Sequence, residues 1–453
     1  MGSSVASTAW PAVPPPNAAA AARRAHALVA CSRGSGFAVL LVGVMAVGVG
    51  DALAGDAFEG ITGPYGERMR YDEKGLTWSF PEQDVKLLIG GRLQVDTGAV
   101  GLSRPVLRDA FPDNVAVRRA WVEPTLTIGK SWLVAFQYDF NDPLLPIKDA
   151  FVAWKGVPNT NLTLGNMKVP FSLEWLESSN DTLFAERSLA NALVPERRFG
   201  LSVGHHGRAW TAVAGLFGNA ASNGVVGDGT AVAARATYAP ILKDDVTLHL
   251  GLAGIHRRRS RGDDDFSLST RAEAFLFGRP FVDTGTIAEV ASVSQLGAEV
   301  AYRTGPYLVQ AEYIRADVER FGGLPTLGFQ GGYVEGSVVL NSGGRDYGLA
   351  PKGGTTYAVF KGVEVAGSQR VSRGGAGVFE VSARYSAIDL DDRAHRGGSE
   401  RDVSVGLSWY PEPNIRFIAN YVHGRVRPGT GQEDLGRRSF SVDAFVARVQ
   451  LYW

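Results

Sequence analysis

The stretch 401-RDVSVGLSWYPEPNIRFIANYVHGRV-426 alternates apolar and polar residues on both sides of a turn that contains two prolines. Valine, leucine and tryptophan occupy every second position from 403 to 409. Apolar residues do the same from 415 to 421, where Arg416 and Asn420 lie on the opposite face. This period of two predicts a β-hairpin with one apolar face. That face could meet either the core of a soluble sandwich or membrane lipid.

The same period recurs from residue 85 to the C-terminus, in segments of about ten residues. In 85-VKLLIGGRLQVD-96, the apolar residues at odd positions oppose Lys86, Arg92 and Asp96. Tight turns alternate with longer loops that are rich in glycine and charge. The clearest further segments are 119–128, 132–140, 246–253, 266–276, 296–303, 378–386 and 444–453. The pattern predicts an all-β chain, with a short helix possible within residues 172–194.

The composition limits the classes of protein to which the chain could belong. Its 453 residues include 56 glycines, which favour turns and sheet over long helices. A mean hydropathy near zero excludes a bundle of transmembrane helices. The 46 basic and 46 acidic residues cancel, so no overall field would attract nucleic acid.

The N-terminal residues 1–54 have the features of a secretory signal peptide. Arg23, Arg24 and Arg33 precede the apolar run 36–50, and the small-residue site 52-ALA-54 follows it. The alternative is an N-terminal membrane anchor, for which the run is short. We predict export by the general secretory route, a short periplasmic segment over 55–84 and a barrel over 85–453. The single cysteine, Cys31, would be removed with the leader.

Two architectures fit the alternating segments. A soluble sandwich alternates in the same way, but a single such domain rarely exceeds about 250 residues. A transmembrane barrel has apolar residues outside, polar residues inside and aromatic residues near the strand ends, where Trp132, Trp154, Trp409 and Tyr410 lie. Export and the number of segments favour an antiparallel barrel of sixteen strands. Eighteen strands remain the alternative, because the count is ambiguous between residues 278 and 375.

Several blocks resemble the phosphate-selective porin O and P family. The blocks 376-AGVFEVSARYSAIDL-390 and 405-VGLSWYPEPNIRFIANYVHG-424 are similar to its closing strands. The blocks 162-LTLGNMKVPFSLE-174, 180-NDTLFAERSLANALVPERRFGLSV-203 and 332-GYVEGSVVL-340 are similar to earlier parts of the same family. The resemblance implies a sixteen-stranded porin in the outer membrane of a Gram-negative bacterium. It further implies a homotrimer surrounded by lipid and lipopolysaccharide, and passive diffusion of small anions, with phosphate or polyphosphate as possible solutes.

A barrel of this size holds a wide water-filled channel, which must be narrowed if it is to select. Residues 172–198 contain many large apolar side chains, and such a loop needs a packing partner. We predict that this third loop folds into the barrel and carries Arg187, Arg197 and Arg198 with it. The alternatives are that it caps the rim or packs against a neighbouring subunit.

Strand parity places many cations on the polar face that would line the lumen, where an oxyanion would need them. With Lys168, which precedes the loop, the strand candidates are Lys86, Arg92, Arg119, Arg235, Arg271, Arg384, Arg416 and Arg448. The same parity places as many acids inside: Asp96, Glu123, Asp139, Glu273, Glu299, Glu312, Glu335 and Glu380. Salt bridges across strands could therefore neutralise any single arginine. We predict an anion-permissive pore without strict phosphate selectivity.

Two rival functions remain at this stage, a barrel enzyme and a structural barrel with a blocked lumen. An enzyme would need a nucleophile and a base brought together. The histidines of the mature chain lie in no arrangement of that kind, and no His and carboxylate cluster has the spacing of metal ligands. We therefore predict no catalytic residues, no metal and no cofactor, and a general or weakly selective porin as the alternative.

Overall fold

The computed structural model describes residues 58–62, 66–103, 114–221, 229–259, 266–351, 354–393, 395–429, 432, 435 and 438–453. The predicted signal peptide, residues 1–54, lies outside these residues and stays a prediction. No helix in the described part of the chain is long and apolar enough to cross a lipid bilayer.

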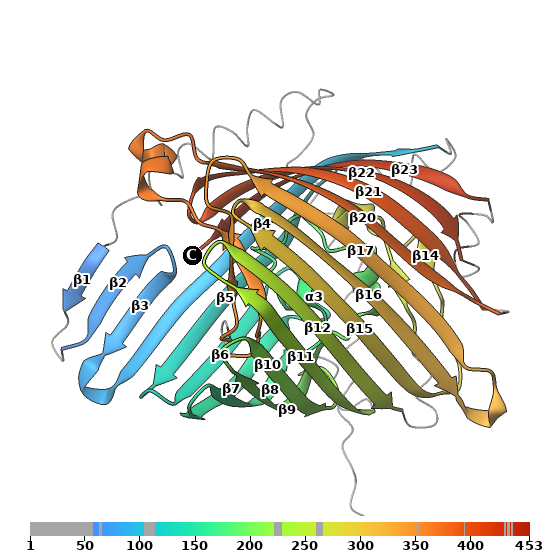
Figure 1. Cartoon of the computed structure of the whole chain (residues 1–453), viewed down its shortest axis with the longest axis horizontal. Coiled ribbons are helices and arrows are strands. Elements are labelled where there is room, and N and C mark those ends of the chain that lie inside the picture. The colour runs from blue at the N-terminus through green and yellow to red at the C-terminus, as the bar shows by residue number, and fades with distance from the viewer. Residues whose placement is uncertain are drawn as a thin grey trace, which may run out of the picture. The chain divides into compact units, whose positions relative to one another are not determined.

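Sixteen antiparallel strands close into a barrel, because each pairs with the next and the last, β23, pairs with the first, β4 (Figure 1). The strands are β4 (Val85–Leu102), β5 (Asn114–Ile128), β6 (Trp132–Asp139), β7 (Ile147–Val157), β8 (Thr160–Lys168), β9 (Arg197–His206), β10 (Trp210–Phe217), β11 (Thr230–Leu242), β12 (Val246–Arg258), β15 (Val290–Thr304), β16 (Tyr307–Arg320), β17 (Leu327–Val339), β20 (Val378–Asp392), β21 (His395–Glu412), β22 (Ile415–Pro428) and β23 (Phe440–Tyr452). The prediction of an all-β barrel with sixteen strands is confirmed.

The alternation of residue types decides which face of each strand points outward. In β21, Val405 is 50 % exposed on the outer face, whereas its neighbour Ser404 is buried inside. Trp409 stacks between Phe379 and Phe417 at ring distances of 6.2 and 5.3 Å. The expectation that Tyr410 lies at the membrane interface is wrong. The Tyr410 side chain lies on the inward-facing side of β21, where its hydroxyl donates to Glu380 Oε2 over 2.8 Å.

The two ends of the barrel differ in their connections. At one end, here called the short-turn end, six connections have only two or three residues, such as 158–159 between β7 and β8. The opposite end, the long-loop end, carries the longer loops, among them residues 169–196 between β8 and β9. One connection at the short-turn end is long, residues 340–377 between β17 and β20, and we call it the insert.

Outward-facing aromatic side chains gather near the short-turn end. Trp132 and Trp154 are exposed and are register partners on β6 and β7. Trp210 and Tyr238 form an equivalent exposed pair on β10 and β11. Such a belt is typical of a barrel whose aromatic side chains lie at a boundary between membrane and water.

Two short hairpins inside the barrel explain why the strand count was ambiguous. β13 (Ser269–Thr270) pairs with β14 (Val282–Asp283), and β18 (Arg345–Gly348) pairs with β19 (Val359–Val363). The prediction of a barrel strand over 266–276 is therefore wrong. That segment belongs to the loop between β12 and β15, and its alternating apolar residues, such as Leu268 and Ala272, pack into the barrel core instead of facing outward.

Three strands precede the barrel and extend its sheet at the short-turn end (Figure 1). β1 (Phe58–Thr62), β2 (Arg68–Asp72) and β3 (Gly75–Phe80) form an antiparallel meander, and β3 pairs with the first residues of β4. A single 3₁₀ turn, η1 (Pro81–Gln83), connects β3 to β4. The C-terminal Trp453 exchanges two backbone hydrogen bonds with Gly91, directly beyond this meander.

The outward face of β21 gives a test of its membrane exposure. Replacing Val405 by arginine should lower the free energy of unfolding by about 2–4 kcal/mol, the cost of a charge on the lipid-facing side near the bilayer midplane. Urea titration of the barrel folded in lipid vesicles measures this. The control Leu324→Arg, on an exposed turn between β16 and β17, should cost less than about 1 kcal/mol. Equal effects at the two positions would contradict the assignment.

Candidate functional site

The loop over residues 169–196, here called the inner loop, folds into the barrel (Figure 1). It contains the short helix α3 (Leu173–Leu176) and the 3₁₀ helix η3 (Leu189–Leu193). The apolar side chains of both helices are buried in the core clusters, which also contain inward-facing residues of β16 and β17. The prediction that the third loop enters the barrel is confirmed, and its large apolar content is the physical reason.

A buried carboxylate fixes the start of α3. The carboxylate of Glu312, on β16, accepts hydrogen bonds from the backbone N–H groups of Leu173 (2.9 Å) and Glu174 (2.7 Å). It also accepts from the Ser172 hydroxyl and from the Tyr333 hydroxyl. The first N–H groups of a helix have no partner within the helix, so they need acceptors from elsewhere in the chain. Glu312, which parity placed in the lumen, therefore holds the inner loop.

Three of the predicted lumen arginines also hold this loop. Arg416 donates to the carbonyl oxygens of Thr182 (2.7 Å) and Leu183 (3.0 Å), and its side chain is 0 % exposed. We expected Arg416 and Asn420 to face water, but the loop covers both: the Asn420 amide oxygen accepts from the N–H of Ala185.

Arg448 and Arg384 complete this set of anchors. Arg448 binds Asp96 of β4 through two hydrogen bonds of 2.6 and 2.7 Å and reaches Glu186 of the inner loop over 2.7 Å. Arg384 contacts three buried carboxylates, whose distances from it lie between 2.6 and 3.2 Å: Glu174, Glu273 and Glu335. Each guanidinium thus ties the loop to the barrel wall through charged hydrogen bonds.

The insert enters the barrel from the short-turn end and meets the inner loop. Arg345 of the insert binds Glu380 through two hydrogen bonds of 2.7 Å and also donates to the carbonyl oxygen of Asp181 in the inner loop. Val359 and Phe360 belong to the same apolar cluster as Leu173 and Leu176 of α3. The two segments, which begin at opposite ends of the barrel, therefore pack against each other inside it.

Arg235 holds the other side of the insert. It pairs with Glu299 at 2.7 Å and donates to the carbonyl oxygens of Tyr357 (2.7 Å) and Ala358 (3.2 Å). Its side chain is buried, so this predicted anion-binding candidate fixes the insert.

Between these segments and the wall formed by β4 to β8 lies a cavity of about 670 Å³, the pore cavity. A second cavity of about 760 Å³, the outer cavity, lies toward the long-loop end. The two share the lining residues Arg118, Asp139, Asp142, Glu186, Arg187, Asn191 and Glu196, so they adjoin. Together they form an off-centre path along one wall of the barrel.

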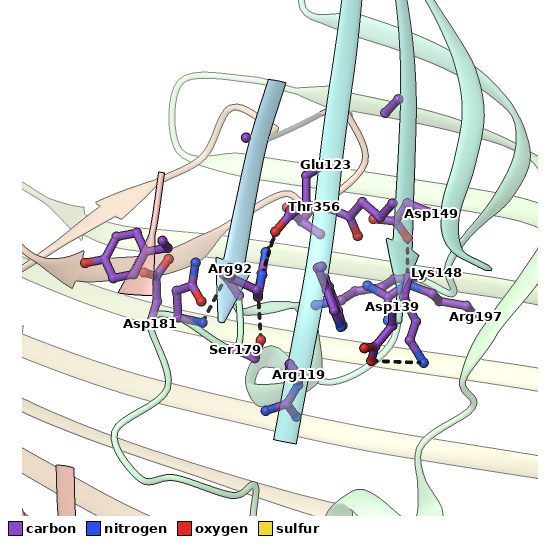
Figure 2. Close-up of a pocket in the computed structure, with 18 of the residues that line it drawn as sticks. Arg92, Arg119, Glu123, Asp139, Lys148, Asp149, Ser179, Asp181, Arg197 and Thr356 are labelled. Carbon is purple, nitrogen blue, oxygen red and sulfur yellow. Dashed lines mark hydrogen bonds and ion pairs between the residues drawn. The ribbon is translucent and has the colours of Figure 1, made fainter. Parts of the chain in front are cut away.

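Most acids that line the pore cavity are bound to cations (Figure 2). Glu123 pairs with Arg92 at 2.6 Å, and Asp149 pairs with Arg197 at 2.6 Å. Further pairs join Asp142 to Lys148 at 2.6 Å, Asp139 to the same lysine at 4.0 Å and Glu186 to Arg118 at 2.8 Å. Burial alone would raise the pKa of the Glu186 carboxyl, but Arg118, Arg119 and Arg448 hold that pKa well below its ordinary value.

Three cations of the same lining are bound only to neutral oxygen atoms. Lys168 donates to the carbonyl oxygens of Trp175 (2.6 Å), Leu176 (3.2 Å) and Glu177 (2.9 Å). Arg187 donates to inner-loop carbonyl oxygens, and Arg119 donates to the Gln94 side chain over 2.7 Å. Among the residues that the structure describes, none of the three makes an ion pair. None of the three therefore has a carboxylate in direct contact.

Two tryptophans lie among these cations. The Arg92 guanidinium carbon is 4.4 Å from the centre of the Trp121 ring. The Trp175 ring is approached by Arg187 (5.1 Å), Lys168 (5.3 Å) and Arg197 (5.7 Å). Such cation–π contacts orient the side chains while each ring still lines the cavity.

The remaining residues predicted to bind anions do not line the pore cavity. Arg198 and Arg271 line the outer cavity, where Arg271 comes from the loop between β12 and β15 rather than from a strand. Lys86 is exposed on the first residues of β4 and lines neither cavity. No group of three or more His, Cys, Asp or Glu among the described residues is placed to hold a metal ion.

The sequence interpretation missed several basic residues. Arg118 lines both cavities. It is the extra residue of a β-bulge, because Val117 and Arg119 on either side of it pair with the consecutive residues Val95 and Gln94 of β4. A bulge breaks strand parity, so alternation could not predict it. Arg257 and Arg259 line the outer cavity, and continuing the parity of 246–253 along the strand would have found both.

Comparisons with known proteins agree with this geometry. The profile of the family described as phosphate-selective porin O and P matches residues 89–453, most of the chain. The chain belongs to the phosphate-selective porin O and P family. It is an outer-membrane porin.

The porin is also similar to individual proteins. It is 27 % identical over 393 residues to an uncharacterized protein of Caulobacter vibrioides, covering 83 % of this chain and 76 % of that protein. Its fold is similar to the outer-membrane protein OmpT of Vibrio cholerae, at a TM-score of 0.50 and 11 % identity, covering 82 % of this chain and 98 % of OmpT. The anion-selective porin from Comamonas acidovorans gives a TM-score of 0.50 at 10 % identity, covering 82 % of this chain and all of that one.

The role of Arg416 in holding the inner loop is testable in the porin. Arg416→Met leaves inner-loop carbonyl oxygens without donors, and each buried unpaired group costs about 1–3 kcal/mol. The loop should loosen, so single-channel recordings should show higher conductance and more open-channel noise than the wild type. Arg425→Met, on the same strand but exposed on the outer face, is the matched control. Wild-type conductance and noise in Arg416→Met would contradict the anchoring role.

Proposed function

We propose that this porin is a channel for passive diffusion of small anions. One observation carries the proposal: Lys168, Arg119 and Arg187 line the pore cavity with no carboxylate partner, whereas Glu123, Asp142, Asp149 and Glu186 in the same lining are bound to arginine or lysine. In the pore cavity a solute therefore meets three cations that contact no carboxylate directly.

The lining of the outer cavity also favours anions over cations. Arg118, Arg187, Arg198, Arg257, Arg259 and Arg271 line it. Of its acids, Glu273 is buried against Arg384 and two serine hydroxyls, and Glu186 is bound to Arg118. Asp139, Asp142 and Glu196 line it as well, so six bases face five acids, a small excess of the sign that attracts anions.

The geometry favours permeation over tight binding. Arg119, Lys168 and Arg187 are already bound to amide or carbonyl oxygens, so a passing anion gains few new hydrogen bonds from them. Conduction needs sites weak enough to release the ion. Phosphate, which the family description suggests, belongs to the proposed class of solutes, as do polyphosphate and chloride.

Reversal potentials in a gradient of potassium chloride across a planar bilayer test the proposal. At about 4 Å in water, one unit charge changes the energy of a monovalent ion by about 1 kcal/mol, which is about fivefold in permeability. Arg119→Gln and Arg187→Gln should therefore each lower the ratio of anion to cation permeability by about fivefold at low salt. The exposed Arg425→Gln should leave it unchanged. A cation preference of the wild-type channel would overturn the proposal.

We also propose, from the family, that the porin forms a homotrimer in contact with lipid and lipopolysaccharide after export by the general secretory route. Cross-linking of the porin in outer-membrane preparations distinguishes trimers from monomers. N-terminal sequencing of the same material tests removal of residues 1–54.

A further inference from the structure

Two arginines lie side by side on the outer face of the barrel, near the long-loop end. Arg401 of β21 and Arg425 of β22 are register partners, and both side chains are exposed. Residues directly opposite each other on neighbouring strands have Cβ atoms about 5 Å apart, and like charges at such positions destabilise a sheet. Their other partners in the same row, Ala387 of β20 and Ser441 of β23, are uncharged. The pair therefore concentrates two positive charges on a small area of the surface.

Neither guanidinium is neutralised within the part of the chain that the structure describes. Asp389 of β20 and Asp443 of β23 are diagonal neighbours of the pair on the outer face, but neither carboxylate forms an ion pair with it. Asp443 Oδ1 instead accepts a hydrogen bond from the Tyr421 hydroxyl over 2.6 Å and contacts His423 Nδ1 over 2.8 Å.

Other outward-facing arginines near this end do have a carboxylate partner. Arg315 of β16 is bound to Asp317 at 2.8 Å, and Arg427 of β22 is bound to Asp391. Arg401 and Arg425 lack such a partner, so their charge is available to an anion from outside the chain.

The pair lies at the edge of the apolar band that faces lipid. Between Trp409, near the short-turn end, and Arg401, the outward side chains of β21 are Leu407, Val405 and Val403. At about 3.3 Å per residue, Arg401 lies about 26 Å along the strand from Trp409. A strand tilt of about 40° makes this about 20 Å across the membrane, close to the height of about 25 Å of such a band. The two arginines therefore lie near the boundary opposite the aromatic belt.

The anions at that boundary are the phosphate groups of lipids. In outer-membrane barrels, the short turns face the periplasm and the longer loops face outward from the cell, so the pair lies at the level of the outer leaflet. A guanidinium matches the geometry of phosphate and binds it through two parallel hydrogen bonds. One phosphate between the two arginines would replace their mutual repulsion by attraction to a shared anion.

We infer that Arg401 and Arg425 form a binding site for a phosphate group of lipopolysaccharide on the outside of the barrel. The inference rests on the proposed contact with lipopolysaccharide and assigns residues to it. Neither arginine lines the pore cavity or the outer cavity, so the site is separate from the path of the solute. The acyl chains of the bound lipid would lie over the apolar outward side chains next to the pair, such as Val403 and Tyr421.

Titration of the full-length porin with lipid A, the phosphorylated lipid of lipopolysaccharide, tests the site. The porin is refolded in nonionic detergent without lipopolysaccharide, and native mass spectrometry measures the fraction that carries lipid A. Loss of one unit charge about 4 Å from a phosphate in water corresponds to about fivefold in affinity. Arg401→Gln should therefore bind lipid A about fivefold more weakly than the wild type. Lipid A without its phosphate groups should also bind the wild type more weakly than intact lipid A.

Arg315→Gln is the matched control, because Arg315 is also exposed on the outer face near the long-loop end but is already bound to Asp317. It should keep the wild-type affinity. Equal affinity of the wild type and Arg401→Gln would overturn the site, as would equal binding of lipid A with and without phosphate.

Two further outcomes have separate meanings. If Arg401→Gln keeps its affinity for lipid A but yields fewer cross-linked trimers from outer-membrane preparations, a second copy of the chain covers this face, and the lipid site is overturned. A wild-type porin that binds no lipid A would overturn the proposed contact with lipopolysaccharide itself. The failure of the site is therefore distinguishable from the failure of that contact.

Discussion

The structure depends on the hydrogen bonds that the backbone of the inner loop must find. Residues 169–196 leave the water at the long-loop end and lie inside the barrel with little regular secondary structure, so many of their carbonyl oxygens have no partner within the loop. Lys168, Arg187 and Arg416 together donate nine hydrogen bonds to carbonyl oxygens of the loop, and Glu312 accepts from the N–H groups at the start of α3. Long cationic side chains can reach these carbonyls from the wall, which gives many basic residues of the lumen a structural role.

Because some lumen cations are needed to satisfy these carbonyl oxygens, the cations fall into two sets. Arg235, Arg345, Arg384, Arg416 and Arg448 are buried and bind the segments that fill the barrel. Arg118, Arg119, Arg187 and Arg197 line the remaining path, so a solute would meet these residues. The balance of acids and bases over the whole lumen therefore says little about selectivity. The charges that matter are those that line the pore cavity, where Lys168 of β8 and Arg187 of the inner loop both support the loop and contact no carboxylate directly.

The sequence was sufficient to predict the strands, because the two-residue period of each strand is a local property and determines which side faces outward. It predicted the inward direction of Arg416 for the same reason. It could not predict that the inner loop covers Arg416, since where a loop packs depends on contacts between distant residues. The alternating segment 266–276 was mistaken for a strand because burial against the core produces the same pattern as exposure to lipid. Arg118 was missed because a bulge interrupts the period.

Arg448 joins two events in the assembly of the barrel. It bridges Asp96 on the first strand, 352 positions away in sequence, and Glu186 on the inner loop. The first and last strands can pair only after the whole chain has been synthesised, and contacts between such distant residues form slowly. The guanidinium that stabilises this seam also fixes the loop. Closure of the barrel and placement of the constricting loop therefore share one side chain, so each of the two events stabilises the other.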